Sequence, residues 1–239
     1  LSNYVMISKY STTYPVTILG DKLNNINVNN MTFDGVTGTL SYDQNTKTLG
    51  LDNVTIKSPD GNSRPAIESS AQNLIVTLTG SNSITSAGMC FKFSSNAEIN
   101  GSGSLNAKSE KSHCFSVYGT NTQITFNTTN SVVTQAAVYG YYGNISDKLI
   151  LKKSSTDINQ YNFAGEGGAI SNLGELILDE SGYQMDFDNS KYSAQNVGLY
   201  FAERKILKNN GEEVKDIYGV SFKSIKEDLG IEVAGKKLR

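Results

Sequence analysis

KLILKKS at residues 148–154 returns 27 residues later as ELILDES at residues 175–181. The Leu-Ile-Leu centre is unchanged, whereas the three lysines of the first segment are replaced by three acidic residues in the second. If the two segments are parallel strands in register, each lysine faces an acid, which stabilises the pairing by roughly 0.2–1 kcal/mol per pair. The pattern therefore predicts a chain that winds in turns stacked on one another.

A small residue followed by a large apolar residue recurs along the chain. The pairs are Ala66-Ile67, Cys90-Phe91, Cys114-Phe115, Ala137-Val138, Ala169-Ile170 and Gly198-Leu199. A second series follows on the next strand, at Ile56, Leu78, Ile99, Phe126, Leu151 and Leu178. A variable period in the twenties, with polar residues between short apolar strands, is typical of a solenoid whose loops differ in length. We therefore expect an all-β protein, a right-handed single-stranded parallel β-helix of about six turns with short β caps at both ends.

Asparagines recur at a fixed distance after the inward positions of this pattern. Asn73, Asn96, Asn121 and Asn144 each follow the large apolar residue by five or six positions. Because asparagine tolerates the left-handed backbone and can hydrogen-bond to its neighbour in the next turn, we expect the four to stack at one corner.

The ends of the chain depart from the repeat. We expect an N-terminal β cap in residues 1–35, the β-helix in residues 36–201 and a C-terminal hairpin or cap in residues 202–239. Within the helix, residues 38–56 are typical of strand, polar turn and strand, with a left-handed residue at Asn45. Residues 231–238 match the pattern of residues 16–23, which predicts the start of a second copy in a tandem array.

Composition narrows the classes of partner. The net charge is −2 and charged residues are 18% of the chain, so the sequence lacks the basic stripe that nucleic acids require. Its apolar runs fall short of the roughly 18 residues of a membrane span, and we expect no membrane insertion. The sequence begins at Leu1 without a leader, so we expect a secreted or cell-surface protein whose signal segment has been removed.

The two cysteines, Cys90 and Cys114, take the small position of their turns. A metal site would lack ligands, because the single histidine, His113, adjoins Cys114 and no Cys-x-x-Cys motif occurs. We therefore expect neither a metal nor another cofactor. We expect the two cysteines to be buried free thiols, although their spacing also permits a disulfide. As neighbours on a strand, His113 and Cys114 point to opposite faces, which argues against a catalytic pair.

Residues 39–56, 78–86 and 99–105 resemble the right-handed β-helix surface proteins of bacteria, a group described as adhesin-like or as carrying a carbohydrate-binding domain. The resemblance covers roughly residues 15–187, and the motifs that carry it are structural. It implies export and a binding role, and it transfers no catalytic residue.

Tyrosine, with 13 residues, is the most promising binding residue, because the chain has no tryptophan and sugar rings stack on aromatic faces. Tyr139, Tyr141 and Tyr142 are close in the sequence, and the step from Phe115 to Val138 predicts that Tyr118 lies over Tyr141. Together with Tyr161 from the next loop, these tyrosines are the candidate contacts to a glycan or a partner protein. The expected function is a non-enzymatic extracellular binding or adhesion module.

Two other functions stay open at this point. A polysaccharide lyase or glycoside hydrolase of the β-helix type would need two carboxyl groups about 5–9.5 Å apart. The richest acidic region, with Glu175, Asp179, Glu180, Asp186 and Asp188, is the candidate source of such a pair. A structural spacer in a tandem-repeat surface protein would need no site at all.

Overall fold

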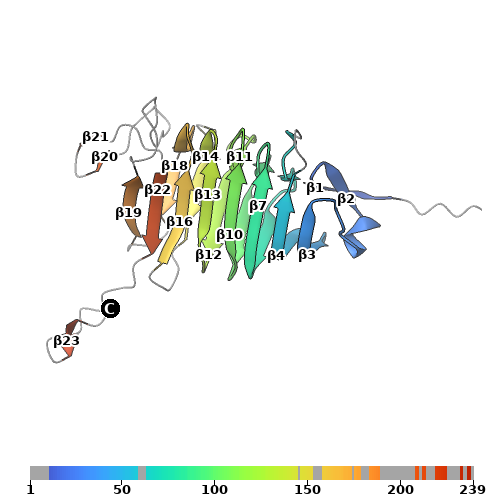
Figure 1. Ribbon diagram of the computed structural model, residues 1–239, viewed down its shortest axis with the longest axis horizontal. Coiled ribbons are helices and arrows are strands. Elements are labelled where there is room, and N and C mark those ends of the chain that lie inside the picture. The colour runs from blue at the N-terminus through green and yellow to red at the C-terminus, as the bar shows by residue number, and fades with distance from the viewer. Residues whose placement is uncertain are drawn as a thin grey trace, which may run out of the picture.

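The computed structural model describes residues 11–58, 63–144, 146–152, 158–173, 175–178 and 183–188, together with short strands at 208–209, 212–213, 219–224, 232–233 and 236–237. Three stacks of parallel strands form the body of the molecule (Figure 1). The first stack contains β5 (Ile67–Ser69), β8 (Phe91–Phe93), β11 (Phe115–Val117), β14 (Tyr139–Tyr142) and β17 (Gly168–Ser171). The second contains β6 (Leu74–Thr79), β9 (Ala97–Gly101), β12 (Gln123–Thr128), β15 (Lys148–Leu151) and β18 (Glu175–Leu178). The third contains β7 (Ser81–Ser86), β10 (Ser104–Ser109), β13 (Val132–Ala136) and β16 (Ile158–Ala164).

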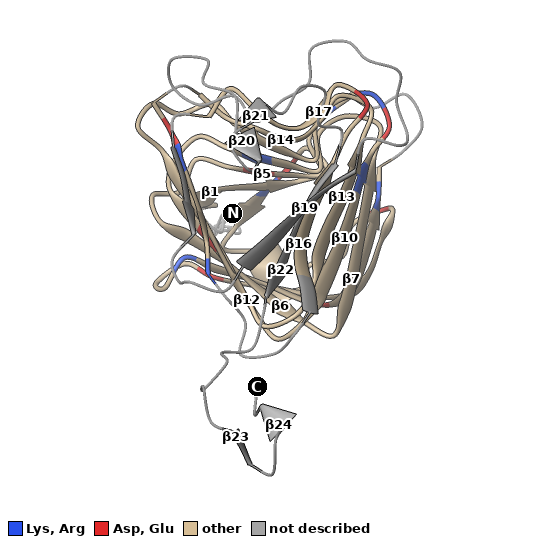
Figure 2. Cartoon of the chain, turned by 90° about the vertical axis from the view of Figure 1, so that its left-hand side faces the viewer, with Lys and Arg blue, Asp and Glu red and all other residues tan. Residues whose placement is uncertain are grey.

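The chain visits the three stacks in turn and then begins again one strand further along, so the architecture is the parallel β-helix that the sequence predicts. Seen along the axis, the stacks are the walls of a tube (Figure 2). Strands β5 to β16 make four complete turns, and β17 with β18 begins another. The described residues thus contain fewer turns than the expected number of about six. The sixth predicted pair, Gly198-Leu199, lies outside the described residues.

The repeated Leu-Ile-Leu segments pair as expected. Strands β15 and β18 are parallel neighbours, with Leu149 beside Leu176 and Lys148 beside Glu175. The first of the three predicted lysine–acid positions is thus confirmed at the level of backbone register. The other two involve Lys153, Asp179 and Glu180, which lie outside the described residues.

The inward positions of the first stack follow the predicted small-then-large pattern with one correction. Ile67, Phe91 and Phe115 are in register, but the next partner is Tyr141 and not Val138. The small residue of that turn is therefore Gly140, and the loop before β14 is three residues longer than the sequence pattern suggested. Gly140 suits this place because an added Cβ would lie 2.8 Å from the carbonyl oxygen of Ala169.

The second apolar series is right in its later members and wrong in its first ones. Ile99, Phe126, Leu151 and Leu178 are stacked in register. Ile99, however, pairs with Val76 on the preceding turn. Leu78 instead lies opposite Leu51, and Ile56 lies opposite Ile84. Alternation by two makes Val76 and Leu78 equally good inward residues, so the sequence could not choose between them.

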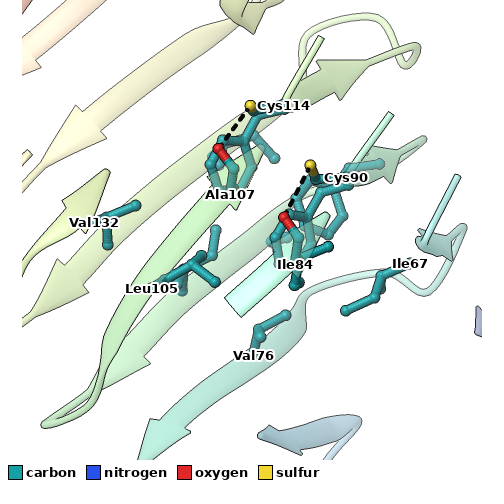
Figure 3. Packing of buried hydrophobic residues seen from close by; sticks show 14 of the residues in the cluster. Ile67, Val76, Ile84, Cys90, Leu105, Ala107, Cys114 and Val132 are labelled. Carbon is teal, nitrogen blue, oxygen red and sulfur yellow. Dashed lines mark hydrogen bonds between the residues drawn. The ribbon is translucent and has the colours of Figure 1, made fainter. Parts of the chain in front are cut away.

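Side chains from all three walls fill the interior. Phe91 stacks on Phe115 with ring centroids 4.8 Å apart, and Phe115 meets the edge of Phe126 at 5.0 Å. Cys90 and Cys114 are buried free thiols on successive turns, as Figure 3 shows. The thiol of Cys114 donates to the carbonyl oxygen of Ala107 at 3.1 Å. The cysteines are therefore core residues.

The predicted asparagine corner forms only in part. Asn96 Nδ2 lies 3.5 Å from Asn73 Oδ1, and Asn73 adopts the left-handed backbone with φ 58°. Gln123 takes the next position, because its backbone N–H donates to Asn96 Oδ1 at 2.8 Å. Asn121 instead donates its backbone N–H to Ser146 Oγ, so a change of loop length displaced it from the row.

Antiparallel strands occupy the N-terminal end of the helix. β1 (Thr13–Ile18) pairs with β2 (Asp21–Asn24) and with β5, and a short 3₁₀ helix follows at Asn27–Asn29. β3 (Val36–Asp43) and β4 (Thr48–Lys57) form the expected hairpin, and β4 then continues along both β6 and β7.

The left-handed residue in the turn between β3 and β4 is Lys47 and not Asn45. Asn45 instead donates its backbone N–H to the Asp43 carboxylate, which favours the right-handed backbone there.

The C-terminal residues supply further antiparallel pairs. β22 (Gly219–Ser224) lies between β16 and β19 (Tyr183–Asp188) and is antiparallel to both (Figure 1). β20 (Lys208–Asn209) and β21 (Glu212–Glu213) form an antiparallel pair within residues 202–239, where a hairpin or cap was expected. β23 (Glu232–Val233) and β24 (Lys236–Lys237) pair so that Val233 lies opposite Lys236, as Ile18 lies opposite Asp21 in β1 and β2. Each of the two matching sequence segments thus forms an antiparallel strand pair of its own. The tandem array stays a prediction.

Candidate functional site

Two of the five candidate tyrosines are core residues. Tyr141 and Tyr161 have no exposed surface, so neither can present its ring to a ligand. Tyr141 takes the inward position of β14, opposite Phe115 and Ile170. The hydroxyl of Tyr161 donates to the carbonyl oxygen of Lys152 at 2.8 Å and accepts a hydrogen bond from Gln160. Including these two tyrosines in the binding site was therefore wrong.

The same register corrects the position of Tyr118. Because Phe115 pairs with Tyr141, Tyr118 does not lie over Tyr141 but follows β11 at the corner between the first and second stacks. It is 52% exposed, which makes it one of the few large side chains available on this surface. The ammonium of Lys92 lies 5.2 Å from the centre of its ring and also pairs with Glu68 at 2.7 Å.

Tyr139 and Tyr142 do meet on the outer face, together with a residue that the sequence reasoning did not assign to binding. The ring of His113 stacks on Tyr142 at 4.6 Å and on Tyr139 at 5.4 Å, with interplanar angles of 10° and 11°. The two tyrosine rings are 5.8 Å apart and also nearly parallel. We call these three residues the aromatic cluster. Each is partly exposed, and all three planes face the same way within 19°.

Register explains how these groups come together. Lys92, Ser116 and Tyr142 occupy equivalent outward positions on β8, β11 and β14. His113 precedes β11, and Tyr139 at the start of β14 donates its backbone N–H to His113 Nδ1 at 3.3 Å. Ser116 is fully buried between its two larger neighbours, and no described group hydrogen-bonds its hydroxyl. The sequence singled out His113 only as a residue whose side chain points away from that of Cys114. The structure agrees, because Cys114 is buried and His113 is partly exposed.

Burial in the aromatic cluster lowers the pKa of His113 to about 4, because the rings displace the water that would stabilise an imidazolium. The hydrogen bond from Tyr139 acts in the same direction, since it requires a lone pair on Nδ1. At neutral pH the cluster is therefore an uncharged aromatic surface.

This lowered pKa predicts that acid destabilises the protein through His113. Between about pH 6.5 and about pH 4 the unfolded chain binds a proton that the folded cluster resists, so folding stability falls as the pH falls. We expect the wild type to lose about 1–2 kcal/mol relative to His113→Phe across this range, a value reduced for partial exposure. Urea unfolding of both proteins at several pH values measures the difference. A constant difference would show that His113 does not titrate in this way.

The acidic residues of the enzyme hypothesis lie on the described strands β18 and β19 and in segments outside the described residues. Glu175 is placed beside Lys148 by register, and Asp186 and Asp188 are in β19, whereas Asp179 and Glu180 lie outside the described residues. Within the described ranges no group of three or more His, Cys, Asp or Glu side chains could hold a metal ion.

The chain matches no protein-family model, no curated protein and no solved structure. A search of the described residues for a helix long and apolar enough to cross a membrane finds none.

Proposed function

We propose that this protein is a non-enzymatic binding module that recognises a glycan through the aromatic cluster. The observation that carries the proposal is the arrangement of His113, Tyr139 and Tyr142, three nearly parallel and partly exposed rings on a rigid sheet. Such rings offer a flat apolar face to the C–H groups of a sugar. Because the rings already stack on one another, little side-chain conformational entropy is lost when a sugar binds.

Polar groups beside the cluster suit the hydroxyls of the same ligand. Lys92 is one strand away from Ser116 and two strands from Tyr142, and its ammonium is held between Tyr118 and Glu68. A sugar on the aromatic cluster would thus find an apolar face and a donor on one side of the first stack. A position at the cell surface stays a prediction from the sequence resemblance.

Binding to a panel of immobilised polysaccharides tests the proposal. We expect retention of the native protein and a loss of about three- to tenfold in affinity for Tyr142→Ala or Tyr139→Ala, the value of one aromatic contact. Tyr14→Ala is the matched control, since Tyr14 also contacts a second tyrosine, Tyr42, but lies at the N-terminal end. Equal affinity of the Tyr142→Ala and native proteins would contradict the proposal.

The same assay separates the alternatives. A lyase or hydrolase would release unsaturated or reducing sugars from the polysaccharides, and such release would contradict a non-enzymatic role. A spacer would be retained by none of them.

A further inference from the structure

The outer face of the second stack carries a groove that the tyrosines do not reach. It has a volume of about 220 Å³ and lies over β6, β9 and β12. One wall consists of Asn73, Asn96 and Gln123, and the other consists of Ile75, Glu98 and Thr125. The residues of the first wall precede those of the second by two positions in each turn, and Leu74, Ala97 and Ile124 between them are buried. The groove therefore runs along the helix axis.

Glu98 is held in place by its neighbours. Its Oε1 accepts hydrogen bonds from Asn127 Nδ2 at 3.0 Å and from Asn100 Nδ2 at 3.4 Å. Asn100 is fixed in turn by the Thr77 hydroxyl, which donates to Asn100 Oδ1 at 2.9 Å. Within the described residues the structure shows no hydrogen bond to Oε2. A preorganised carboxylate oxygen is thus free to accept from a ligand.

The opposite wall is made of carboxamides at successive turns. Asn73, Asn96 and Gln123 offer donors and acceptors at intervals of about 4.8 Å, the spacing of neighbouring strands. Carboxamides and a carboxylate match hydroxyl groups, which both donate and accept, better than they match a purely cationic ligand. The partly exposed Ile75 adds an apolar contact for a C–H face.

The dimensions favour a narrow ligand. The groove extends over three strands, or roughly 10 Å, and its volume is below the roughly 300–1,000 Å³ of sites that enclose a whole small molecule. We propose that this groove binds a linear, uncharged oligosaccharide that lies along the helix axis, with its hydroxyls on Glu98 and on the carboxamide wall. The groove belongs to a different stack from the aromatic cluster, so this inference does not depend on the proposed function.

Calorimetric titration with cellotetraose, xylotetraose and mannotetraose tests the inference. At least one of these should bind the native protein with a Kd between about 1 µM and about 1 mM. Glu98→Gln and Gln123→Ala, one on each wall, should each weaken that binding about tenfold. Gln123→Ala guards against misfolding, because the hydrogen bond of Gln123 to Asn96 comes from its backbone. Glu110→Gln, an exposed carboxylate after β10, is the control and should bind as the native protein does.

Three results would overturn the inference. No heat of binding from any tetraose at about 10 mM would exclude the ligand class. Full affinity in both groove variants, with loss in Tyr142→Ala, would assign the sugar to the aromatic cluster and leave the proposed function standing. Binding of tetralysine that is lost in Glu98→Gln, without tetraose binding, would make the groove a site for cations.

Discussion

Replacing Phe126 with alanine is expected to lower the free energy of unfolding by about 3–5 kcal/mol. Phe126 is fully buried on β12, and its ring meets Phe115 at 5.0 Å, Phe163 at 5.6 Å and Tyr161 at 5.8 Å. These three rings come from the first and third stacks, so Phe126 joins all three walls. The cavity cannot close without moving β12, which parallel ladders to β9 and β15 hold in place. Denaturant unfolding of the native and variant proteins measures the effect.

Tyr118→Ala is the matched control for this experiment. It also removes an aromatic ring, but that ring is 52% exposed, and the Lys92 ammonium lies 5.2 Å from its centre. We expect a loss below about 1 kcal/mol. A loss of similar size for Phe126→Ala would mean that the three walls do not share one packed interior.

Asp147→Asn is expected to raise the free energy of unfolding by about 1–3 kcal/mol at neutral pH. Asp147 has no exposed surface, and its Oδ1 accepts the backbone N–H of Thr122 at 2.8 Å. Neither its Oδ2 nor the buried hydroxyl of Tyr141 has a hydrogen-bond partner in the described chain. Burial therefore raises the pKa of Asp147, and the charge of Asp147 adds to the burial that raises the pKa of Tyr141. An asparagine keeps the acceptor for Thr122 and removes a charge whose burial outweighs the hydrogen bonds from Thr122 and Asn144.

The pH dependence of this gain gives a second measurement. A carboxyl group with a raised pKa holds its proton more tightly in the folded state, so its contribution is most favourable at low pH and is lost as the pH rises through the folded pKa. The advantage of Asp147→Asn over the wild type should therefore grow as the pH rises above the ordinary pKa of an aspartate. This trend has the opposite sign to that of His113, and each variant isolates its own group.

Asp43→Asn is the control for the change of acid to amide. The backbone N–H of Asn45 holds the pKa of Asp43 below its usual value, so this substitution should destabilise the hairpin at neutral pH. If Asp147→Asn also destabilised the protein, the hydrogen bonds to the Asp147 carboxylate would outweigh the cost of burying its charge.

Several features followed from the amino-acid sequence alone. Leu149 stacks beside Leu176, both cysteines fill the small inward position as free thiols, and residues 36–57 form a hairpin. Each depends on a local pattern with strong physical consequences. Alternation by two sets the buried face of a strand, a repeated apolar segment sets its neighbour, and a polar turn between two strands makes them antiparallel.

The proposed binding surface was decided only by the tertiary structure. Three additional residues before β14 make Tyr141 the partner of Phe115, which buries Tyr141 and brings Tyr139 and Tyr142 against His113. The groove around Glu98 likewise depends on which positions of β6, β9 and β12 are level with one another. Strand periodicity states which residues share a face, but the lengths of the loops set the register between turns. Lengthening a loop by a few residues changes the free energy of folding little, and the pattern of apolar residues does not reveal it. Register alone therefore determined which aromatic and polar side chains meet on the outer surface.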